Sequence, residues 1–384
     1  MVSANLIKIK WKRGRFMSEP VNRRTQSGGH SAFGRPLALW TGKPLATACS
    51  LLAAFTLSSV VTLSVAATES APEKADTAQT TLYSVESARA SRSLLLDVAH
   101  AGARLVVVGE RGHILYSDDQ GKTWTQARVP TRQLLTSVYF VDDKHGWAVG
   151  HDAQILASND GGASWVKQFE DLSREAPLLD VWFKDASTGF AVGAYGMLLT
   201  TLDGGQHWED VSDRLDNEDQ YHLNGITQVA DSGLFVVGEA GAMFRSRDEG
   251  ESWEKLEGPY QGSLFGAMGT GQPGTLLVYG LRGNLYRSTD FGDTWEPIEL
   301  KAARGPLEFG LANATLLNDG SLVLVGNGGS VMRSTDNGLS FQVFNRPDRI
   351  SLSGVTADAQ GNLILVGQGG VRVTSPTGAE SSQQ

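Results

Sequence analysis

An eight-residue pattern, Ser/Thr-x-Asp-x-Gly-x-x-Trp/Phe, recurs six times along this chain of 384 residues. Its first copy runs from Ser117 to Trp124. The aspartates of the six copies are Asp119, Asp160, Asp203, Asp248, Asp290 and Asp336. Their spacings of 41, 43, 45, 42 and 46 residues match the length of a four-stranded propeller blade. The chain is therefore predicted to fold as a β-propeller.

Each copy has the composition of a capped hairpin turn. Ser, Thr and Asp side chains accept hydrogen bonds from backbone N–H groups, and Gly tolerates positive φ. The aromatic residue begins the following strand, where its ring can be buried between neighbouring blades. Six similar turns around a ring cannot converge on one site. We therefore interpret the six aspartates as structural rather than as metal ligands or catalytic acids.

Three predicted strands come before each turn, as in residues 178–183, 189–193 and 197–201. We name the strands of a repeat A to D in chain order, with the capped turn between C and D. The glycines that end strand B recur seven times: Gly109, Gly150, Gly193, Gly238, Gly280, Gly326 and Gly367. The sequence therefore predicts an all-β, seven-bladed propeller with four-stranded blades over residues 81–375.

The seventh repeat, over residues 352–374, ends without an aspartate box and lacks a strand D. A β-prone segment upstream of the first repeat, residues 81–85, is expected to supply the missing strand. Such a closure leaves no exposed sheet edge in the ring. Residues 68–80 are then a linker, and residues 376–384 are expected to be a disordered tail.

The N-terminal region has the features of an export signal. Residues 1–67 hold nine Lys and Arg and one acid, and they end in an apolar run over residues 45–67. Small residues before Ala66 and Ala67 provide cleavage sites. The run is also long enough to span a bilayer as an uncleaved anchor. We expect an exported, periplasmic protein that either loses residues 45–67 or keeps them as a membrane anchor, with Met17 as an alternative start.

Charge and cysteine content restrict the classes of partner and cofactor. Without residues 1–67, 24 basic and 41 acidic residues give a net charge of −17. A domain this acidic repels phosphate, so no nucleic-acid partner is expected. The single cysteine, Cys49, lies in the signal, so the exported part has no disulfide. His151 and Asp152 lack a Cys or a second His at ligand spacing, and we predict neither a metal site nor a cofactor.

Propeller topology places the B–C turns and D–A loops on one face, and the aspartate boxes and A–B turns on the other. Function is expected on the first face, where basic side chains gather in an otherwise acidic protein. Arginine forks form bidentate bonds with carboxylates, so these residues predict a dock for an acidic partner. The alternative is that each arginine pairs with a neighbouring Asp or Glu. The candidate partner-binding residues are Arg111, Arg132, Arg282, Arg304 and Arg349.

The aspartate boxes, with strand-B signatures over residues 142–150 and 185–193, resemble those of the photosystem II stability and assembly factor family. The resemblance covers about residues 81–375. It implies an exported, non-enzymatic scaffold that holds a membrane-protein subunit through an arginine-rich face, and we expect the protein to be monomeric. Arg111 and Arg282 are its best candidates for that face. Family members in bacteria without a photosystem imply an envelope membrane complex or transporter as the partner.

Two alternatives belong to other functional classes. Sialidases share the aspartate box and need three arginines, a Tyr–Glu nucleophile pair and an acid. Here Arg104 is followed by Leu105, where such enzymes carry Arg-Ile-Pro, and seven blades are counted where sialidases have six. We therefore assign no catalytic residue. The sialidase candidates would be Arg111, Arg282 and Arg349 with Tyr195 or Tyr260 and Glu239. A carbohydrate-binding propeller would instead stack sugar rings on Tyr195, Tyr221 and Tyr260.

Overall fold

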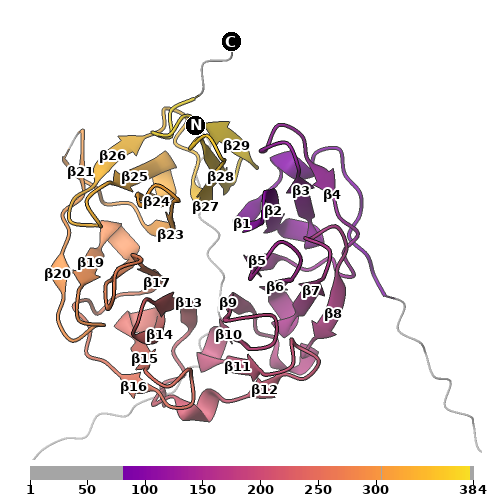
Figure 1. Cartoon of the computed structure of the whole chain (residues 1–384), viewed down its shortest axis with the longest axis horizontal. Helices are drawn as coiled ribbons and strands as arrows, with labels where there is room; N and C mark the ends of the chain where they lie inside the picture. Colours follow the sequence, from indigo (N-terminus) through magenta and orange to yellow (C-terminus); the bar gives the residue numbers. More distant parts are fainter. Residues whose placement is uncertain (1–80, 304, 381–384) are drawn as a thin grey trace, which may run out of the picture. The chain divides into compact units, whose positions relative to one another are not determined.

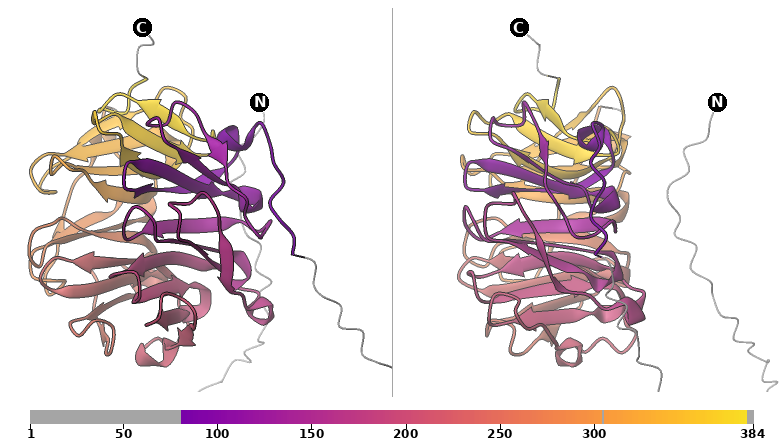
Figure 2. Two further views of the ribbon diagram at one scale, coloured as in Figure 1. Left: turned by 45° about the vertical axis from the view of Figure 1, so that its right-hand side comes forward. Right: turned by 90° about the vertical axis from the view of Figure 1, so that its right-hand side faces the viewer.

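The computed structural model describes residues 81–303 and 305–380, in which seven antiparallel sheets are arranged in a ring and a two-stranded hairpin is added (Figure 1). Six of these sheets have four strands, and the last has three. Within each sheet the strands follow chain order, so strands A to D of a blade are sheet neighbours. The side views show the strands running between the two faces of the ring (Figure 2). The predicted all-β, seven-bladed propeller is confirmed.

The first three blades are regular. Blade 1 contains β1 (Leu95–Ala101), β2 (Arg104–Gly109), β3 (Ile114–Ser117) and β4 (Thr125–Gln126). Blade 2 contains β5 (Leu135–Phe140), β6 (Gly146–Gly150), β7 (Ile155–Ser158) and β8 (Val166–Phe169). Blade 3 contains β9 (Leu178–Phe183), β10 (Gly189–Gly193), β11 (Leu198–Thr201) and β12 (Glu209–Asp210).

The remaining blades include the incomplete one. Blade 4 contains β13 (Leu223–Val229), β14 (Gly233–Gly238), β15 (Met243–Ser246) and β16 (Glu254–Lys255). Blade 5 contains β17 (Leu264–Gly269), β18 (Leu276–Gly280), β19 (Leu285–Ser288) and β20 (Glu296–Pro297). A hairpin of β21 (Lys301–Ala302) and β22 (Gly305–Pro306) leads to blade 6, with β23 (Leu311–Leu316), β24 (Leu322–Gly326), β25 (Ser330–Ser334) and β26 (Gln342–Asn345). Blade 7 contains β27 (Leu352–Ala357), β28 (Leu363–Gly367) and β29 (Arg372–Thr374).

Strand A of each blade packs against strand A of the next, from β1 around to β27, so these strands surround the axis. Every strand A begins with a leucine and then a β-bulge, seen as a register shift against strand B. A bulge re-aims the residue that follows it. The residues after the seven bulges are Asp97, Ser137, Asp180, Gly225, Gly266, Asn313 and Gly354.

Apolar side chains fill the spaces between adjacent blades. Between blades 2 and 3, for example, the rings of Trp147 and Phe183 stack with centroids 3.4 Å apart. Between the last and first blades, Ile364 and Val366 belong to one buried cluster with Leu105. Strand B of each blade is buried over most of its length because neighbouring blades cover both of its faces.

The six aspartate boxes share one set of hydrogen bonds, illustrated by the box of blade 4. The Ser246 hydroxyl accepts from the Gly250 N–H at 2.7 Å and donates to Asp248 at 2.8 Å. Asp248 also accepts from the Ser252 N–H at 2.9 Å and hydroxyl at 2.6 Å. These bonds, the Ser252 hydroxyl first, lower the pKa of Asp248 to about 2. The box aspartates are therefore occupied within their own turns.

We expect Ser246→Ala to destabilise the propeller by about 1–3 kcal/mol, because it leaves the buried N–H of Gly250 without its acceptor. Ser252→Ala in the same box is the matched control. Ser252 is exposed, so its loss should cost well under half as much. Urea denaturation followed by tryptophan fluorescence measures both variants. Equal effects would show that the buried hydroxyl is not the critical member of the box.

Arginines at the ends of three C strands tie neighbouring blades together on the face of the boxes. Arg245 donates to the Phe291 carbonyl at 3.0 Å, and Arg287 donates to that of Asn337 at 3.0 Å. Both acceptors precede the glycine of the next blade's box. Arg333 donates at 3.0 Å to the Pro376 carbonyl, beyond the last strand.

The predicted closure of the ring by residues 81–85 is wrong. These residues form no strand and lie against blade 1, where Ser84 N–H donates to the Val129 carbonyl at 2.9 Å. Among the described residues, the outer edge of β29 is met only by Glu380, through a single bridge to Thr374. Blades 7 and 1 instead join directly, as where the Ser353 hydroxyl donates to the Leu95 carbonyl at 2.7 Å. A β-prone segment does not determine which blade it will contact.

Within the expected tail over residues 376–384, residues 376–380 form a turn. Gly378 has φ of 83° and contacts Val331, just as the box glycines contact residues of the preceding blade. Its carbonyl accepts at 2.8 Å from Arg346, whose side chain is 1% exposed. Residues 374–378 thus take the place of a seventh box in which Pro376 stands where the aspartate would be. Residues 381–384 lie outside the described residues.

Within residues 81–303 and 305–380, no helix is long and apolar enough to cross a membrane. The predicted signal or anchor over residues 1–67, with the linker over 68–80, lies outside the described residues.

Candidate docking face

Six of the seven B–C turns have the same backbone, a single turn of 3-10 helix with a left-handed residue at its tip. These turns are η2 (Glu110–Gly112), η3 (His151–Ala153), η5 (Ala194–Gly196), η7 (Glu239–Gly241), η8 (Leu281–Gly283) and η9 (Asn327–Gly329). Backbone bonds anchor them, as where Glu110 N–H donates to the Leu94 carbonyl at 3.0 Å. The tip residues, with φ of 55–67°, are Arg111, Asp152, Tyr195, Ala240, Arg282 and Gly328.

Three of the predicted arginines are exposed and have no ion pair among the described residues. They are Arg111, Arg282 and Arg349. They also share a left-handed backbone, with φ of 59°, 58° and 53°. An unpaired guanidinium can exchange water directly for a carboxylate, because no internal ion pair has to break first.

Local pairing does account for other arginines of this face. Arg174 lies 2.8 Å from Asp171 and 2.7 Å from Asp210. Arg346 is buried and bonded to the C-terminal turn. The structure therefore separates arginines that are paired within the fold from arginines that are exposed and unpaired. The position of a loop in the sequence does not give this distinction.

The remaining predicted arginines differ in status. Arg132 is exposed, and its Nε donates to the Tyr83 carbonyl at 2.8 Å. Arg128 stacks on the Tyr83 ring at 3.9 Å. The segment that was expected to complete blade 7 therefore covers part of the basic surface of blade 1. Arg304 lies outside the described residues.

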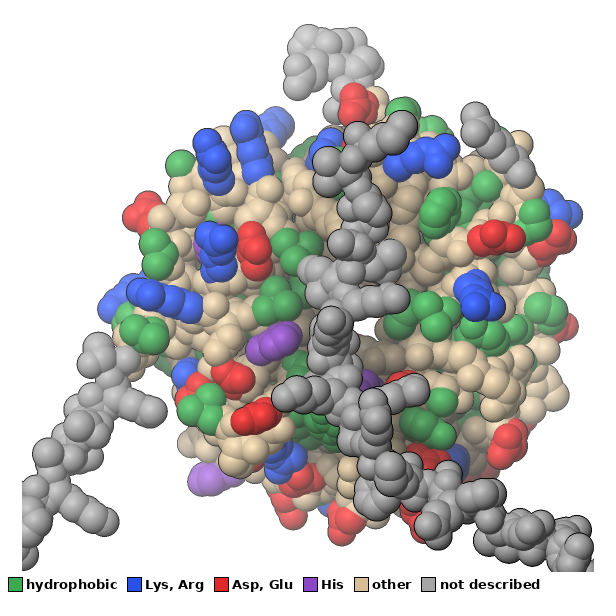
Figure 3. Space-filling model, turned by 180° about the vertical axis from the view of Figure 1, so that it is seen from behind, with side chains coloured by type: hydrophobic (Ala, Val, Ile, Leu, Met, Phe, Trp, Pro, Cys, Tyr) green, Lys and Arg blue, Asp and Glu red, His purple; other side chains and the backbone are tan. Residues whose placement is uncertain are grey.

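Charge is divided across this face. Figure 3, which views it, shows most Lys and Arg in the upper part of the face, with some Asp and Glu among them, and mostly Asp and Glu along its lower edge. The exposed arginines of blades 1 and 7 and their loops are Arg89, Arg92, Arg111, Arg128, Arg132 and Arg349. The exposed acids of the loops around blades 3 and 4 are Glu175, Asp213, Asp216, Glu218, Asp219 and Glu257. Sequence reasoning missed Arg89 and Arg92, although Arg89 precedes η1 (Ala90–Arg92) and Arg92 ends it, just before the first strand, where a D–A loop lies.

The sialidase candidates come from several different blades. Arg111 and Arg282 belong to blades 1 and 5, and Arg349 precedes blade 7. Tyr260 stacks on Tyr286 with ring centroids 6.4 Å apart. The Glu239 carboxylate lies 4.0 Å from His222 Nε2. Neither contact is the Tyr–Glu pair that sialidase chemistry needs.

The axis carries a small polar cavity of about 130 Å³ lined by strand A residues. Ser137 Oγ lies 3.1 Å from an Asp97 oxygen and 2.8 Å from an Asp180 oxygen. Asp97 also accepts from the Val138 N–H at 2.9 Å, and thus ties blade 1 to blade 2. Burial raises the pKa of Asp97 to about 7 and that of Asp180 to about 6. No Lys, Arg or His lines this cavity to offset the two carboxyl groups.

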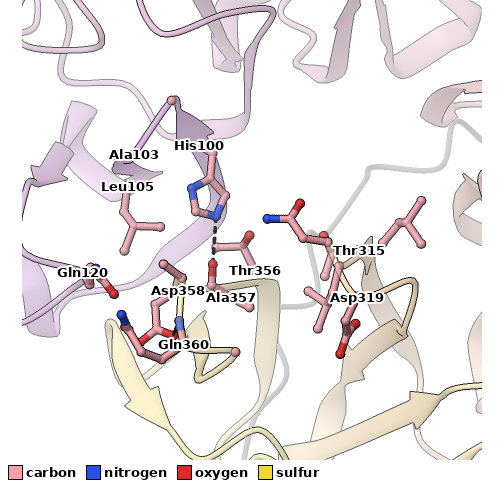
Figure 4. A pocket seen from close by; sticks show the side chains of 16 residues that line it. His100, Ala103, Leu105, Gln120, Thr315, Asp319, Thr356, Ala357, Asp358 and Gln360 are labelled. Atoms are coloured by element: carbon pink, nitrogen blue, oxygen red, sulfur yellow. Dashed lines mark hydrogen bonds between the residues drawn. The ribbon is translucent and has the colours of Figure 1, made fainter.

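A larger cavity, of about 590 Å³, lies on the opposite face, where the A–B turns of blades 1, 6 and 7 meet (Figure 4). Three of its polar side chains are already used within the fold, whereas the buried Gln120 Oε1 has no hydrogen-bond partner among the described residues. His100 Nε2 bonds to the Ala357 carbonyl at 2.9 Å, and Asp319 pairs with Arg333 at 2.7 Å. Asp358 accepts from the Gln360 N–H of its own turn at 2.9 Å. No cluster of three or more His, Cys, Asp or Glu suited to a metal occurs in the described part of the chain.

Comparison with known families confirms the resemblance. The family model described as "Photosynthesis system II assembly factor YCF48" matches residues 122–176 and 167–305. The BNR/Asp-box repeat model matches residues 115–126. The chain is therefore similar to this assembly-factor family over residues 122–305. This similarity extends over the boxes of blades 2 to 5, both strand-B signatures and four of the B–C turns.

Curated relatives align over parts of their length. The photosystem II assembly protein Ycf48 of Synechococcus sp. (strain JA-2-3B'a(2-13)) is 35% identical over 133 residues, which are 34% of this chain and 39% of the relative. The chloroplastic photosystem II stability/assembly factor HCF136 of Cyanidioschyzon merolae is 35% identical over 95 residues, 23% of this chain and 22% of the relative. The aligned segments thus span less than half of these relatives.

Solved structures share the fold. "YCF48 bound to D1 peptide" superposes with a TM-score of 0.58 and 18% identity, covering 73% of this chain and 91% of that chain. Streptogramin B lyase superposes with a TM-score of 0.61 and 12% identity, covering 76% and 97%. At these identities the similarity shows the fold alone. Because one of these neighbours is an enzyme, the propeller by itself does not separate scaffolds from catalysts.

Proposed function

We propose that this protein is an exported, non-enzymatic scaffold that docks an acidic segment of a membrane protein on its B–C and D–A face. The observation that carries the proposal is the set of exposed arginines, Arg111, Arg282 and Arg349, without an ion pair among the described residues. Relatives named as assembly factors support it, as does the solved structure of YCF48 with a D1 peptide. The partner here is a subunit of an envelope membrane complex or transporter.

The division of charge gives this docking face a direction. Long-range attraction brings a partner's carboxylates to the mostly basic part of the face, and the mostly acidic part repels them. Each guanidinium can then form a charge-assisted bond stronger than a neutral one. The bound segment is accordingly expected to lie over blades 1, 7, 6 and 5 and to avoid blades 3 and 4.

The test is in-cell crosslinking of the tagged full-length chain, followed by mass spectrometry. We expect Arg111→Glu/Arg282→Glu to reduce capture of the membrane partner at least 100-fold, because two attractive contacts become repulsive. Lys122→Glu/Lys144→Glu is the matched control, since both lysines are exposed on the opposite face and the change in net charge is the same. Equal loss in the control would show that net charge, rather than this face, governs binding.

A fluorogenic sialoside assay tests the non-enzymatic part of the proposal. We expect no turnover above the background of the assay. Turnover that disappears on Glu239→Gln while the unfolding temperature is unchanged would overturn the assignment as a scaffold.

A further inference from the structure

Three apolar side chains are exposed side by side on blades 5 and 6 of the docking face. Phe265 of β17 is 37% exposed, Leu281 of η8 is 39% exposed, and Phe309 of the loop before β23 is 42% exposed. A Cβ on Gly310 would lie 3.5 Å from the Phe265 ring, so this ring adjoins the loop that carries Phe309. A Cβ on Gly283, at the end of η8, would lie 3.6 Å from the Phe309 carbonyl. We call these three side chains the apolar patch.

The patch exists because blade 6 has no side chain at the tip of its B–C turn. The tip residue is Gly328, whereas Arg, Asp, Tyr or Ala occupies this place in η2, η3, η5, η7 and η8. A Cβ on Gly328 would lie 3.0 Å from the Phe309 ring, so the ring lies over the glycine. At this one position an aromatic ring from the preceding loop replaces a tip side chain. Figure 3 shows hydrophobic side chains near the centre of the face, beside basic ones.

Two unpaired arginines flank the patch. Arg282 follows Leu281 directly at the tip of η8. On the other side, a Cβ on Gly329 of η9 would lie 3.2 Å from the Arg349 Cα. Single exposed apolar residues are ordinary, but a contiguous group beside unpaired charges is typical of an interaction surface. The order across the face is therefore a cation, an apolar surface and a second cation.

We propose that the apolar patch receives an apolar side chain from the same acidic peptide segment whose carboxylates bind Arg282 and Arg349. The inference rests on the proposed function and adds a requirement to it. The bound segment must carry a carboxylate and an apolar residue within a few positions of each other. Charge complementarity selects this occupant, because two unpaired guanidinium groups beside an apolar surface match an acidic, apolar peptide. Apolar burial then adds affinity that charge alone does not provide.

The experiment measures the fluorescence anisotropy of four labelled nine-residue peptides with the purified full-length chain. The first peptide has two glutamates followed by two leucines in a Ser/Gly background, with an amidated C-terminus. The second replaces the leucines with serine, and the third replaces the glutamates with glutamine. The fourth is the third with a free C-terminal carboxylate, which separates a side-chain carboxylate from a terminal one. We expect the first peptide to bind at least 10-fold more tightly than the second and third.

Phe309→Ser should lower the affinity for the first peptide to that for the second and leave the second peptide unaffected. Leu281→Ser should act in the same direction, and an unchanged unfolding temperature excludes misfolding for both variants. Leu202→Ser is the matched control, since Leu202 is 72% exposed in the box of blade 3 on the other face. It should change neither affinity.

Several outcomes separate this inference from the function on which it rests. Equal binding of the first two peptides, with both weakened by Arg282→Glu, would overturn the apolar requirement and leave the scaffold intact. Absence of binding for every peptide, together with failed crosslinking, would overturn both. Self-association in sedimentation that Phe309→Ser abolishes would make the patch an interface between copies of this chain and overturn the peptide proposal.

Discussion

Ending the chain at Thr374 is expected to destabilise the propeller by about 3–5 kcal/mol, the usual result of leaving a buried charge without its partners. The charge belongs to Arg346, whose side chain is 1% exposed. The truncation removes the Gly378 carbonyl, which accepts from Arg346 at 2.8 Å, and the Glu380 carboxylate at 3.5 Å. Only Asp348, at 3.1 Å, remains as an acidic partner among the described residues. The midpoint of urea denaturation measures the loss.

Two comparisons make this prediction specific. A chain ending at Glu380 keeps every described contact of the turn and should unfold at the same urea concentration as the full chain. Adding Arg346→Met to the truncated chain should recover part of the loss, because an apolar side chain needs no partner in that site. If the truncated chain matches the full chain, the C-terminal turn does not contribute to closing the last blade.

Stability is expected to fall as the pH rises from about 5 to 8, by about 1–3 kcal/mol. In the folded chain, burial raises the pKa of Asp97 to about 7 and of Asp180 to about 6, above their ordinary value of 3.8. A raised pKa means that the folded state holds protons that the unfolded state has released. The contribution of these two carboxyl groups to the stability of the fold is therefore complete below about pH 4. It is lost as the pH rises through 6 and 7. Denaturation by urea at several pH values measures it.

Hydrogen-bond geometry supports the same sign. The oxygens of Asp97, Ser137 and Asp180 form a row with separations of 3.1 and 2.8 Å. Two hydrogen bonds in that row need two protons, and the serine hydroxyl supplies only one. One carboxyl must therefore be protonated to supply the other. Asp97→Asn should flatten the fall in stability between pH 5 and 8, because an amide does not titrate in this range. An unchanged pH profile in that variant would show that the triad is not its source.

Below about pH 4 the aspartate boxes are expected to make the stability of the fold decrease as the pH falls. Hydrogen bonds within its turn lower the pKa of Asp336 to about 2, with the Ser334 hydroxyl as the first donor. A carboxyl with a lowered pKa contributes stability at pH values above its ordinary pKa. This stability is lost as the pH falls toward 2. Asp119, Asp203 and Asp248 behave in the same way. The greatest stability is therefore expected near pH 4, where neither effect has begun.

The sequence predicted the repeated part of the fold because each repeat carries its own local signals. A box such as that ending at Trp253 and a glycine such as Gly238 recur at blade spacing, so strand order and count followed from the pattern. The ends of the ring lack this repetition. Residues 81–85 have strand-like composition, but Ser84 bonds to Val129 of the loop after β4. The turn over residues 374–378 was not predicted, because Pro376 stands in place of the aspartate by which the other boxes are recognised.

The candidate site was predictable as a face but not as a set of residues. Turn spacing placed Arg111 and Arg282 at the tips of B–C turns, where the structure also has them. Whether an arginine is available depends on contacts between segments distant in sequence, such as the bond of Arg346 to Gly378. The apolar patch depends on such a contact as well, since the ring of Phe309 covers Gly328. Periodicity alone carries no information about either contact.

The shared backbone of the B–C turns separates the identity of a tip residue from the stability of the fold. Backbone hydrogen bonds to the start of strand A hold each turn in place, and the tip side chain is not needed for them. A left-handed residue other than Gly costs only about 1 kcal/mol. Selection can therefore exchange the side chain at one tip without disturbing the blades or the other tips. The ring acts as a set of independent variable positions, and one scaffold can acquire a new partner through a few single-residue changes.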